Sequence, residues 1–211
     1  MKRLFAVVLC LLLVLLLFAQ AFAAPLADIA TIDAQVDKYF KLSKTVGGAL
    51  VIMRNGSIVY QRNYGYSNKS NKTPVTEDTY FRIASITKMV SAIGIMQLVE
   101  QGKLDLDRDI SAYFGYEIVN PYYPKTPITL RQCMSHTTSL SQGGGYSFQS
   151  RTVHDLLAKE MHHWSNFTRE KPGAIYEYSN FGAGLMGSMM EAAAGESINQ
   201  YMREQVFRPL G

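Results

Sequence analysis

Hydrophobic and polar positions recur with two different periods along the chain, and each period predicts a different element. Apolar residues spaced three and four apart over residues 28–44 predict an amphipathic helix. Over residues 48–53 and 57–64 the pattern becomes that of strands, and the intervening Asn55-Gly56 is the strongest two-residue signal for a hairpin turn. The sequence therefore predicts a helix followed by an antiparallel hairpin.

The helical period returns after a polar loop at residues 67–79. Apolar residues over 86–99 point to most sides of a helix that ends at Gly102, which predicts that this helix is buried. The stretch 104–149 is rich in loops, and no repeat or linker indicates a second domain. Three further helices are predicted at residues 152–161, 181–194 and 197–207.

The N-terminus has the order of a secretory signal peptide. Lys2 and Arg3 precede an apolar run over residues 4–18, and the small-residue site Ala21-Phe22-Ala23 follows. We expect cleavage of residues 1–23 and export of one domain over 24–211, secreted or periplasmic. The alternative is an uncleaved membrane anchor, since residues 4–24 are interrupted only by Gln20 and are just long enough to span a bilayer.

Composition and charge narrow the class of protein. With 47% apolar and 18% charged residues, the chain is typical of globular proteins and not of disordered ones. After cleavage, 188 residues would carry 19 basic and 17 acidic side chains, which does not favour nucleic-acid binding. Cys133 would then be the single cysteine, so no internal disulfide is possible, and we expect it to be buried.

The strongest candidate chemistry is Ser85-Ile86-Thr87-Lys88 at the start of the apolar helix. An S-x-x-K spacing places a hydroxyl and an amine on one face, one turn apart. The motif occurs about once by chance in a chain of this length, so its position matters more than its letters. A helix N-terminus favours a negatively charged oxygen, and burial lowers the pKa of a lysine, so Ser85 and Lys88 suit a nucleophile and its base.

A second candidate is Tyr178-Ser179-Asn180, which precedes the helix predicted at 181–194. A phenol beside a lysine can relay protons, and an Asn amide can orient the lysine and bind a substrate carbonyl. The same tripeptide occurs as Tyr66-Ser67-Asn68, at the end of a predicted strand, where we interpret it as part of a turn.

These residues resemble the serine β-lactamases of class C and the related penicillin-binding D-alanyl-D-alanine peptidases and esterases. The resemblance runs from about Gly47 to Gly211, and Tyr178 in place of the serine of S-D-N points to class C. It implies an α/β fold of the α+β type, with an antiparallel sheet flanked by helices beside a helical region. It also implies acylation of Ser85, proton transfer shared by Lys88 and Tyr178, and contact of Asn180 with the substrate amide.

Other polar motifs are interpreted structurally. The stretch 135–140 resembles the family's H-T-S-G-L turn with Ser139 in the place of Gly, so His136 is expected to pack and cap. Asp105, Asp107 and Asp109 lack the Gly and Glu that a calcium loop needs. His154, His162 and His163 fit no metal spacing. We therefore expect no metal and no cofactor.

The family's third motif, K-T-G or H-x-G on a later strand, does not occur in the sequence. We expect the C-terminal strands to be missing from this chain, either because it is a fragment or because it is a shortened, inert relative. The expected function is that of a secreted serine hydrolase acting on a β-lactam, D-Ala-D-Ala-type peptide, amide or ester. The substrate is expected to be a small molecule or a part of peptidoglycan. The alternative is a non-catalytic extracellular domain that binds a peptidoglycan-like or acyl ligand. The sequence does not predict the oligomeric state.

Overall fold

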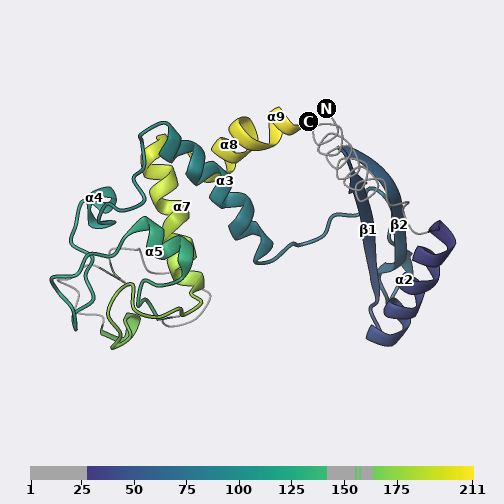
Figure 1. The fold of residues 1–211 in the computed structure, drawn as a ribbon, viewed down its shortest axis with the longest axis horizontal. Helices are drawn as coiled ribbons and strands as arrows, with labels where there is room; N and C mark the ends of the chain where they lie inside the picture. The colour runs from purple at the N-terminus through teal and green to yellow at the C-terminus, as the bar shows by residue number, and fades with distance from the viewer. Residues whose placement is uncertain (1–27, 142–154, 156, 158–163) are drawn as a thin grey trace, which may run out of the picture. The chain divides into compact units, whose positions relative to one another are not determined.

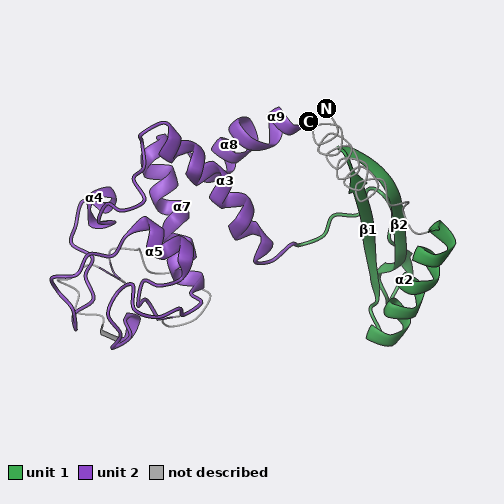
Figure 2. Cartoon of the chain, in the orientation of Figure 1, with its two compact units in different colours: residues 1–82 green, residues 83–211 purple. Residues whose placement is uncertain are grey.

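The computed structural model describes residues 28–141, 155, 157 and 164–211 (Figure 1). The chain divides into two compact units, residues 1–82 and 83–211, which Figure 2 colours green and purple. The predicted signal peptide and the helix predicted at 152–161 lie outside the described residues, apart from two single positions of the latter. No helix among the described residues is long and apolar enough to cross a membrane.

The first unit is a helix packed on an antiparallel sheet. Helix α2 spans Ile29–Ser43, and the hairpin consists of β1, Gly47–Arg54, and β2, Ser57–Asn68. Asn55 and Gly56 both have positive φ, at 52° and 77°, as a tight hairpin turn requires. The predicted helix and hairpin are confirmed.

Aromatic and charged contacts hold α2 against the hairpin. The rings of Phe40 and Tyr64 stack with centroids 4.3 Å apart, and Gly48 permits this because a Cβ there would lie 2.9 Å from Phe40. Arg62 on β2 forms an ion pair with Asp33 on α2 at 2.6 Å. One face of the hairpin is therefore covered by the helix.

The prediction of a polar loop at residues 67–79 was wrong in part. Strand β2 runs four residues beyond its predicted end, and a two-residue strand β3, Thr73–Pro74, pairs with it, so that the sheet order is β1-β2-β3. The Asn68 side chain accepts the Ser70 N–H at 2.9 Å, which turns the chain back. Two residues are too few to produce an alternating pattern, which is why the sequence did not indicate β3.

The second unit is built around two helices of 15 residues, α3 (Ile86–Glu100) and α7 (Asn180–Ala194). They approach closely at Gly94, where a Cβ would lie 2.6 Å from Met190 Cε. The core between and around them includes Ile95 and Leu98 of α3 and Leu185, Met189 and Met190 of α7. Helix α7 and its cap Gly195 confirm the prediction for 181–194.

The remaining elements of this unit are short. Helix α5 begins with a capping box in which Thr129 and Gln132 each bond the other's backbone N–H. The T-x-x-Q spacing could have indicated this helix, which the prediction of a loop-rich stretch overlooked. These elements are α4 (Ser111–Phe114), α5 (Leu130–Ser135), the 3-10 turn η2 (Trp164–Asn166), α8 (Ile198–Tyr201), the π-helix η3 (Met202–Phe207) and α9 (Arg208–Leu210).

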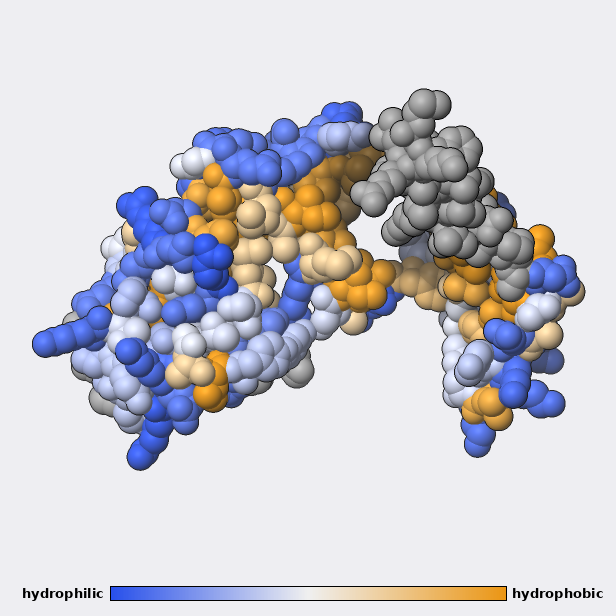
Figure 3. All heavy atoms as spheres, in the orientation of Figure 1, coloured by the Kyte–Doolittle hydropathy of each residue, from blue (hydrophilic) through white to orange (hydrophobic). Residues whose placement is uncertain are grey.

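The prediction that the helix after Ser85 is buried was wrong in part. Only Gly94, Ile95 and Leu98 of α3 are buried, and they lie on the side that faces the core. The opposite side is exposed in the second unit, and Figure 3 shows it as a hydrophobic surface. The spacing of apolar residues shows how many sides of a helix are apolar, but not how many of those sides a neighbouring element covers. The exposed side carries Ile86, Met89, Ile93 and Met96.

Candidate active site

Ser85 lies at the N-cap of α3, with its side chain exposed and not used to cap the helix. The preceding residue, Ala84, has φ of 45°, a left-handed conformation that is rare for a residue with a Cβ. Such strain is most often kept where it positions a functional group. The helix dipole places its positive end beside Oγ, which favours a negative charge on that oxygen.

Lys88 connects Ser85 to the second motif. Its Nζ donates to Ser85 Oγ at 3.2 Å and to Asn180 Oδ1 at 2.7 Å. The lysine is half-buried on α3, one turn after the serine. Asn180 thus orients the ammonium group, the role that its position in the sequence predicted for the amide.

Tyr178 completes the cluster from the loop before α7. Its phenol oxygen lies 2.6 Å from Ser85 Oγ, and Lys88 Nζ lies 5.0 Å from the centre of its ring. The Lys88 ammonium, and then the Ser85 hydroxyl, hold the pKa of Tyr178 below its usual value of 10. A phenol with a lowered pKa is a better proton acceptor near neutral pH than an ordinary tyrosine.

The start of α7 places Tyr178 and Asn180 on this cluster. Ser179, which is 1% exposed, is the N-cap, and its Oγ accepts the Gly182 N–H at 3.0 Å. Tyr178, the residue before the cap, and Asn180, the first residue of the helix, then both project toward Lys88. All four predicted site residues come together within the second unit, whereas Tyr66-Ser67-Asn68 forms a strand end and a turn in the first unit.

His136 is the residue near the site whose contacts the sequence did not predict. It is the C-cap of α5, with φ of 57°, as expected of a capping residue. Its ring also lies 4.5 Å from that of Tyr178, and its Nδ1 accepts the Ser179 N–H at 3.3 Å. Burial, and then the charge of Lys88, lowers the pKa of His136 below its usual value of 6.5. Nothing in the local sequence indicates these long-range contacts.

The other polar motifs and the cysteine have structural roles where they fall among the described residues. Asp105 accepts the Asp107 N–H, Asp107 pairs with Arg131 at 2.7 Å, and Asp109 accepts the Ser111 N–H. Cys133 is fully buried, and burial raises the pKa of its thiol to about 12, which makes it a poor nucleophile. His154, His162 and His163 lie outside the described residues.

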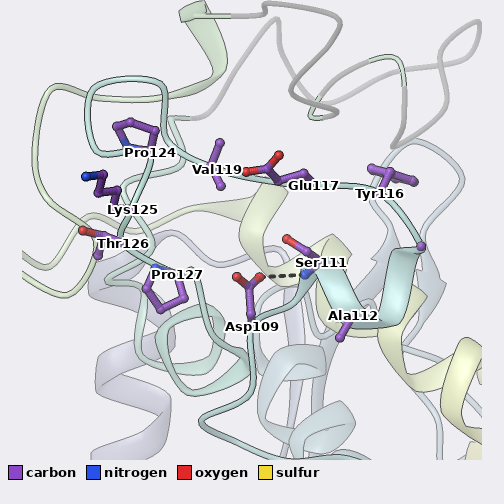
Figure 4. Close-up of a pocket in the computed structure, with 11 residues that line it drawn as sticks. Asp109, Ser111, Ala112, Tyr116, Glu117, Val119, Pro124, Lys125, Thr126 and Pro127 are labelled. Carbon is purple, nitrogen blue, oxygen red and sulfur yellow. Dashed lines mark hydrogen bonds between the residues drawn. The ribbon is translucent and has the colours of Figure 1, made fainter.

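A pocket of about 470 Å³ lies elsewhere in the second unit, between α4 and residues 124–127 (Figure 4). Its walls carry the charged residues Asp109, Glu117 and Lys125, and none of the four site residues lines it. The pocket is therefore separate from the serine cluster.

Comparisons with known proteins identify the family of the chain. The sequence model of the Beta-lactamase family matches residues 32–211. The chain belongs to the beta-lactamase family. It is 31% identical over 199 residues to the D-alanyl-D-alanine-carboxypeptidase/endopeptidase AmpH of Escherichia coli strain K12, across 92% of this chain and 51% of AmpH.

Solved structures share its fold, an antiparallel sheet with helices of the β-lactamase type. The octameric penicillin-binding protein homologue from Pyrococcus abyssi matches with a TM-score of 0.72 and 26% identity, over 88% of this chain and 43% of that one. The D-amino acid amidase from Ochrobactrum anthropi SV3 matches with a TM-score of 0.65 and 30% identity, over 82% of this chain and 47% of that one. The chain spans about half the length of AmpH and of these proteins.

Proposed function

We propose that the protein is a serine hydrolase of the class C type that forms an acyl-enzyme on Ser85. The observation that carries this proposal is the position of Ser85 Oγ, 2.6 Å from the Tyr178 phenol oxygen and 3.2 Å from Lys88 Nζ. Hydrogen-bond contact between a nucleophile, a base and a group that orients the base is the requirement for covalent catalysis.

Acylation starts with transfer of the Ser85 hydroxyl proton to the Tyr178 phenolate. Oγ then bonds to the substrate carbonyl carbon, and negative charge develops on the carbonyl oxygen near the N-terminus of α3. Collapse of this intermediate breaks the bond to the leaving group, which takes the proton held by Tyr178. Lys88 stabilises the phenolate throughout, and Asn180 holds Lys88 in place.

Deacylation repeats these steps with water as the nucleophile. Water gives a proton to the phenolate and attacks the acyl carbon, the bond to Oγ breaks, and Ser85 regains the proton. The proposed substrates are the acyl compounds that such a site accepts: β-lactams, D-Ala-D-Ala-type peptides, amides and esters. The names of AmpH and of the D-amino acid amidase support the peptide and amide classes.

Covalent labelling tests the proposal. The chain is treated with a fluorophosphonate or with penicillin, and the modified peptide is located by mass spectrometry. We expect one adduct on Ser85, lost in Ser85→Ala and retained in Ser67→Ala, the serine of the second Tyr-Ser-Asn tripeptide. An adduct elsewhere, or none with either probe, would favour the non-catalytic alternative.

A further inference from the structure

Both chain neighbours of Tyr178 are hydrogen-bonded to one residue, His136. The Glu177 N–H donates to the His136 carbonyl at 2.8 Å, and the Ser179 N–H donates to His136 Nδ1 at 3.3 Å. The imidazole ring lies 4.5 Å from the Tyr178 ring, tilted by 39°. His136 therefore holds the backbone on each side of the phenol and contacts the phenol ring as well.

The bond from Ser179 is difficult to replace. Ser179 is 1% exposed, so water does not readily reach its N–H if the imidazole withdraws. A buried donor without a partner costs free energy comparable to its desolvation. Loss of this bond would loosen the N-cap of α7, and with it Tyr178 and Asn180, the two residues beside the cap.

We propose that His136 is a positioning residue for the acylation reaction, whose neutral imidazole keeps the Tyr178 phenol on Ser85. This inference rests on the proposed function. His136 acts through the backbone of residues 177 and 179, and its ring contacts the Ser179 N–H and the rings of Tyr176 and Tyr178, so it is distinct from the proton-transferring groups.

The proposal predicts that protonation of His136, in addition to that of Tyr178, affects how the acylation rate depends on pH. Nδ1 accepts a hydrogen bond only when it carries no proton, so protonation turns it into a donor facing the Ser179 N–H. The groups around the ring are Lys88 from α3 and Tyr176 and Tyr178 from the loop before α7. Burial and the Lys88 charge both oppose protonation, which keeps the imidazole neutral at neutral pH.

Two substitutions of His136 distinguish the effect of the hydrogen bond at Nδ1 from the effect of the left-handed backbone. His136 has φ of 57°, a conformation that Asn and Gly adopt more readily than other residues. His136→Asn offers an amide oxygen near the position of Nδ1 and does not titrate. His136→Gly suits the same backbone and offers no acceptor. Thermal unfolding of both variants, followed by circular dichroism, establishes that they fold.

The first measurement is the rate of Ser85 acylation at pH 7.5 and across the acidic range. We expect His136→Asn to keep the wild-type rate within about threefold and His136→Gly to lose about tenfold, the effect of one lost hydrogen bond. At pH values below the lowered pKa of His136, the logarithm of the wild-type rate should fall with a slope greater than one, because Tyr178 and His136 each take up a proton. In His136→Asn the slope should be one.

The second measurement does not depend on catalysis. In protein labelled with ¹³C at tyrosine Cζ, the Tyr178 resonance should report the same phenol pKa in the wild type and His136→Asn, and a higher one in His136→Gly. If the wild type is not acylated, the proposed function is wrong. The titration of Tyr178 would still show whether His136 positions the phenol. Equal effects of Asn and Gly on the titration, or a wild-type rate in His136→Gly, would overturn the inference.

Discussion

The phenol oxygen of Tyr178 lies 2.6 Å from Oγ of Ser85, although 93 positions separate the two residues in the chain. Lys88 contacts both partners of this pair and is itself held by Asn180. The four side chains form one connected network, and substitutions within it should therefore not act independently.

Removal of Lys88 and removal of the Tyr178 hydroxyl should have overlapping effects. We expect Lys88→Ala and Tyr178→Phe each to raise the acylation barrier by several kcal/mol, and the double variant to be little worse than either, because they serve one proton relay. Single-turnover acylation rates of the three variants provide the measurement. Tyr66→Phe, in the second Tyr-Ser-Asn tripeptide, is the matched control and should leave the rate unchanged.

The pH dependence of acylation should follow the phenol. Because the active form of Tyr178 is the phenolate and its pKa is lowered, the rate should rise with pH and level off below pH 10. Lys88 is the largest cause of the lowering, so Lys88→Met should move the plateau to higher pH. Rate profiles between pH 5 and 10.5 test this. A plateau that stays in place without the ammonium group would contradict the assignment.

Ser139 occupies the position at which the family's H-T-S-G-L stretch has Gly, and the backbone conformation at this position explains why glycine is preferred there. Its φ is 63°, in the left-handed region, and its hydroxyl accepts a bond from Asn120 at 2.9 Å. Ser139→Gly and Ser139→Ala both lose the hydroxyl, but only glycine relieves the backbone. We expect the glycine variant to be more stable than the alanine variant by about 1 kcal/mol, measured by urea unfolding.

Asn120 should keep its place when that hydroxyl is removed. Its amide nitrogen also donates to the carbonyls of Thr168 and Glu170, at 3.0 and 3.1 Å, so both of its hydrogens still find acceptors. Asn120→Leu, which removes all of these bonds from a fully buried position, should destabilise the second unit far more than Ser139→Gly. Comparable losses in the two variants would show that the serine bond dominates.

Export should remove the N-terminal segment. The order of Lys2-Arg3, the apolar run and Ala21-Phe22-Ala23 predicts a mature protein that begins at Ala24. N-terminal sequencing of the protein from an exporting host measures this directly. A product that begins at Met1 and stays with the membrane fraction would favour the anchor.

The sequence predicted the site better than its surroundings. Ser85 and Lys88 are one helical turn apart, so their proximity follows from local geometry, and side-chain chemistry together with the family resemblance indicated Tyr178 and Asn180. The hydrogen bonds that His136 accepts from Glu177 and Ser179 depend on a left-handed residue at the end of one helix meeting the start of another. No periodicity in either segment contains that information.

Burial around the site was harder to predict for the same reason. The apolar residues of α3 indicated a helix correctly, but whether Met89 or Ile93 is covered depends on which elements pack beside it. Strand β3 was overlooked because two residues, Thr73 and Pro74, carry no alternation, while the side chain of Asn68 makes the turn. Local patterns specify the elements, and tertiary packing decides their environment.

The left-handed backbone of Ala84 limits which amino acids can precede the serine. At φ of 45° a β-branched side chain such as Val or Ile is a severe steric outlier, whereas Gly, Asn and Asp fit more readily. Variation at this position should therefore be confined to small or Asx side chains in any chain that keeps this turn. A valine before an S-x-x-K motif would identify a coincidental match, and the rule can be applied to a sequence without a structure.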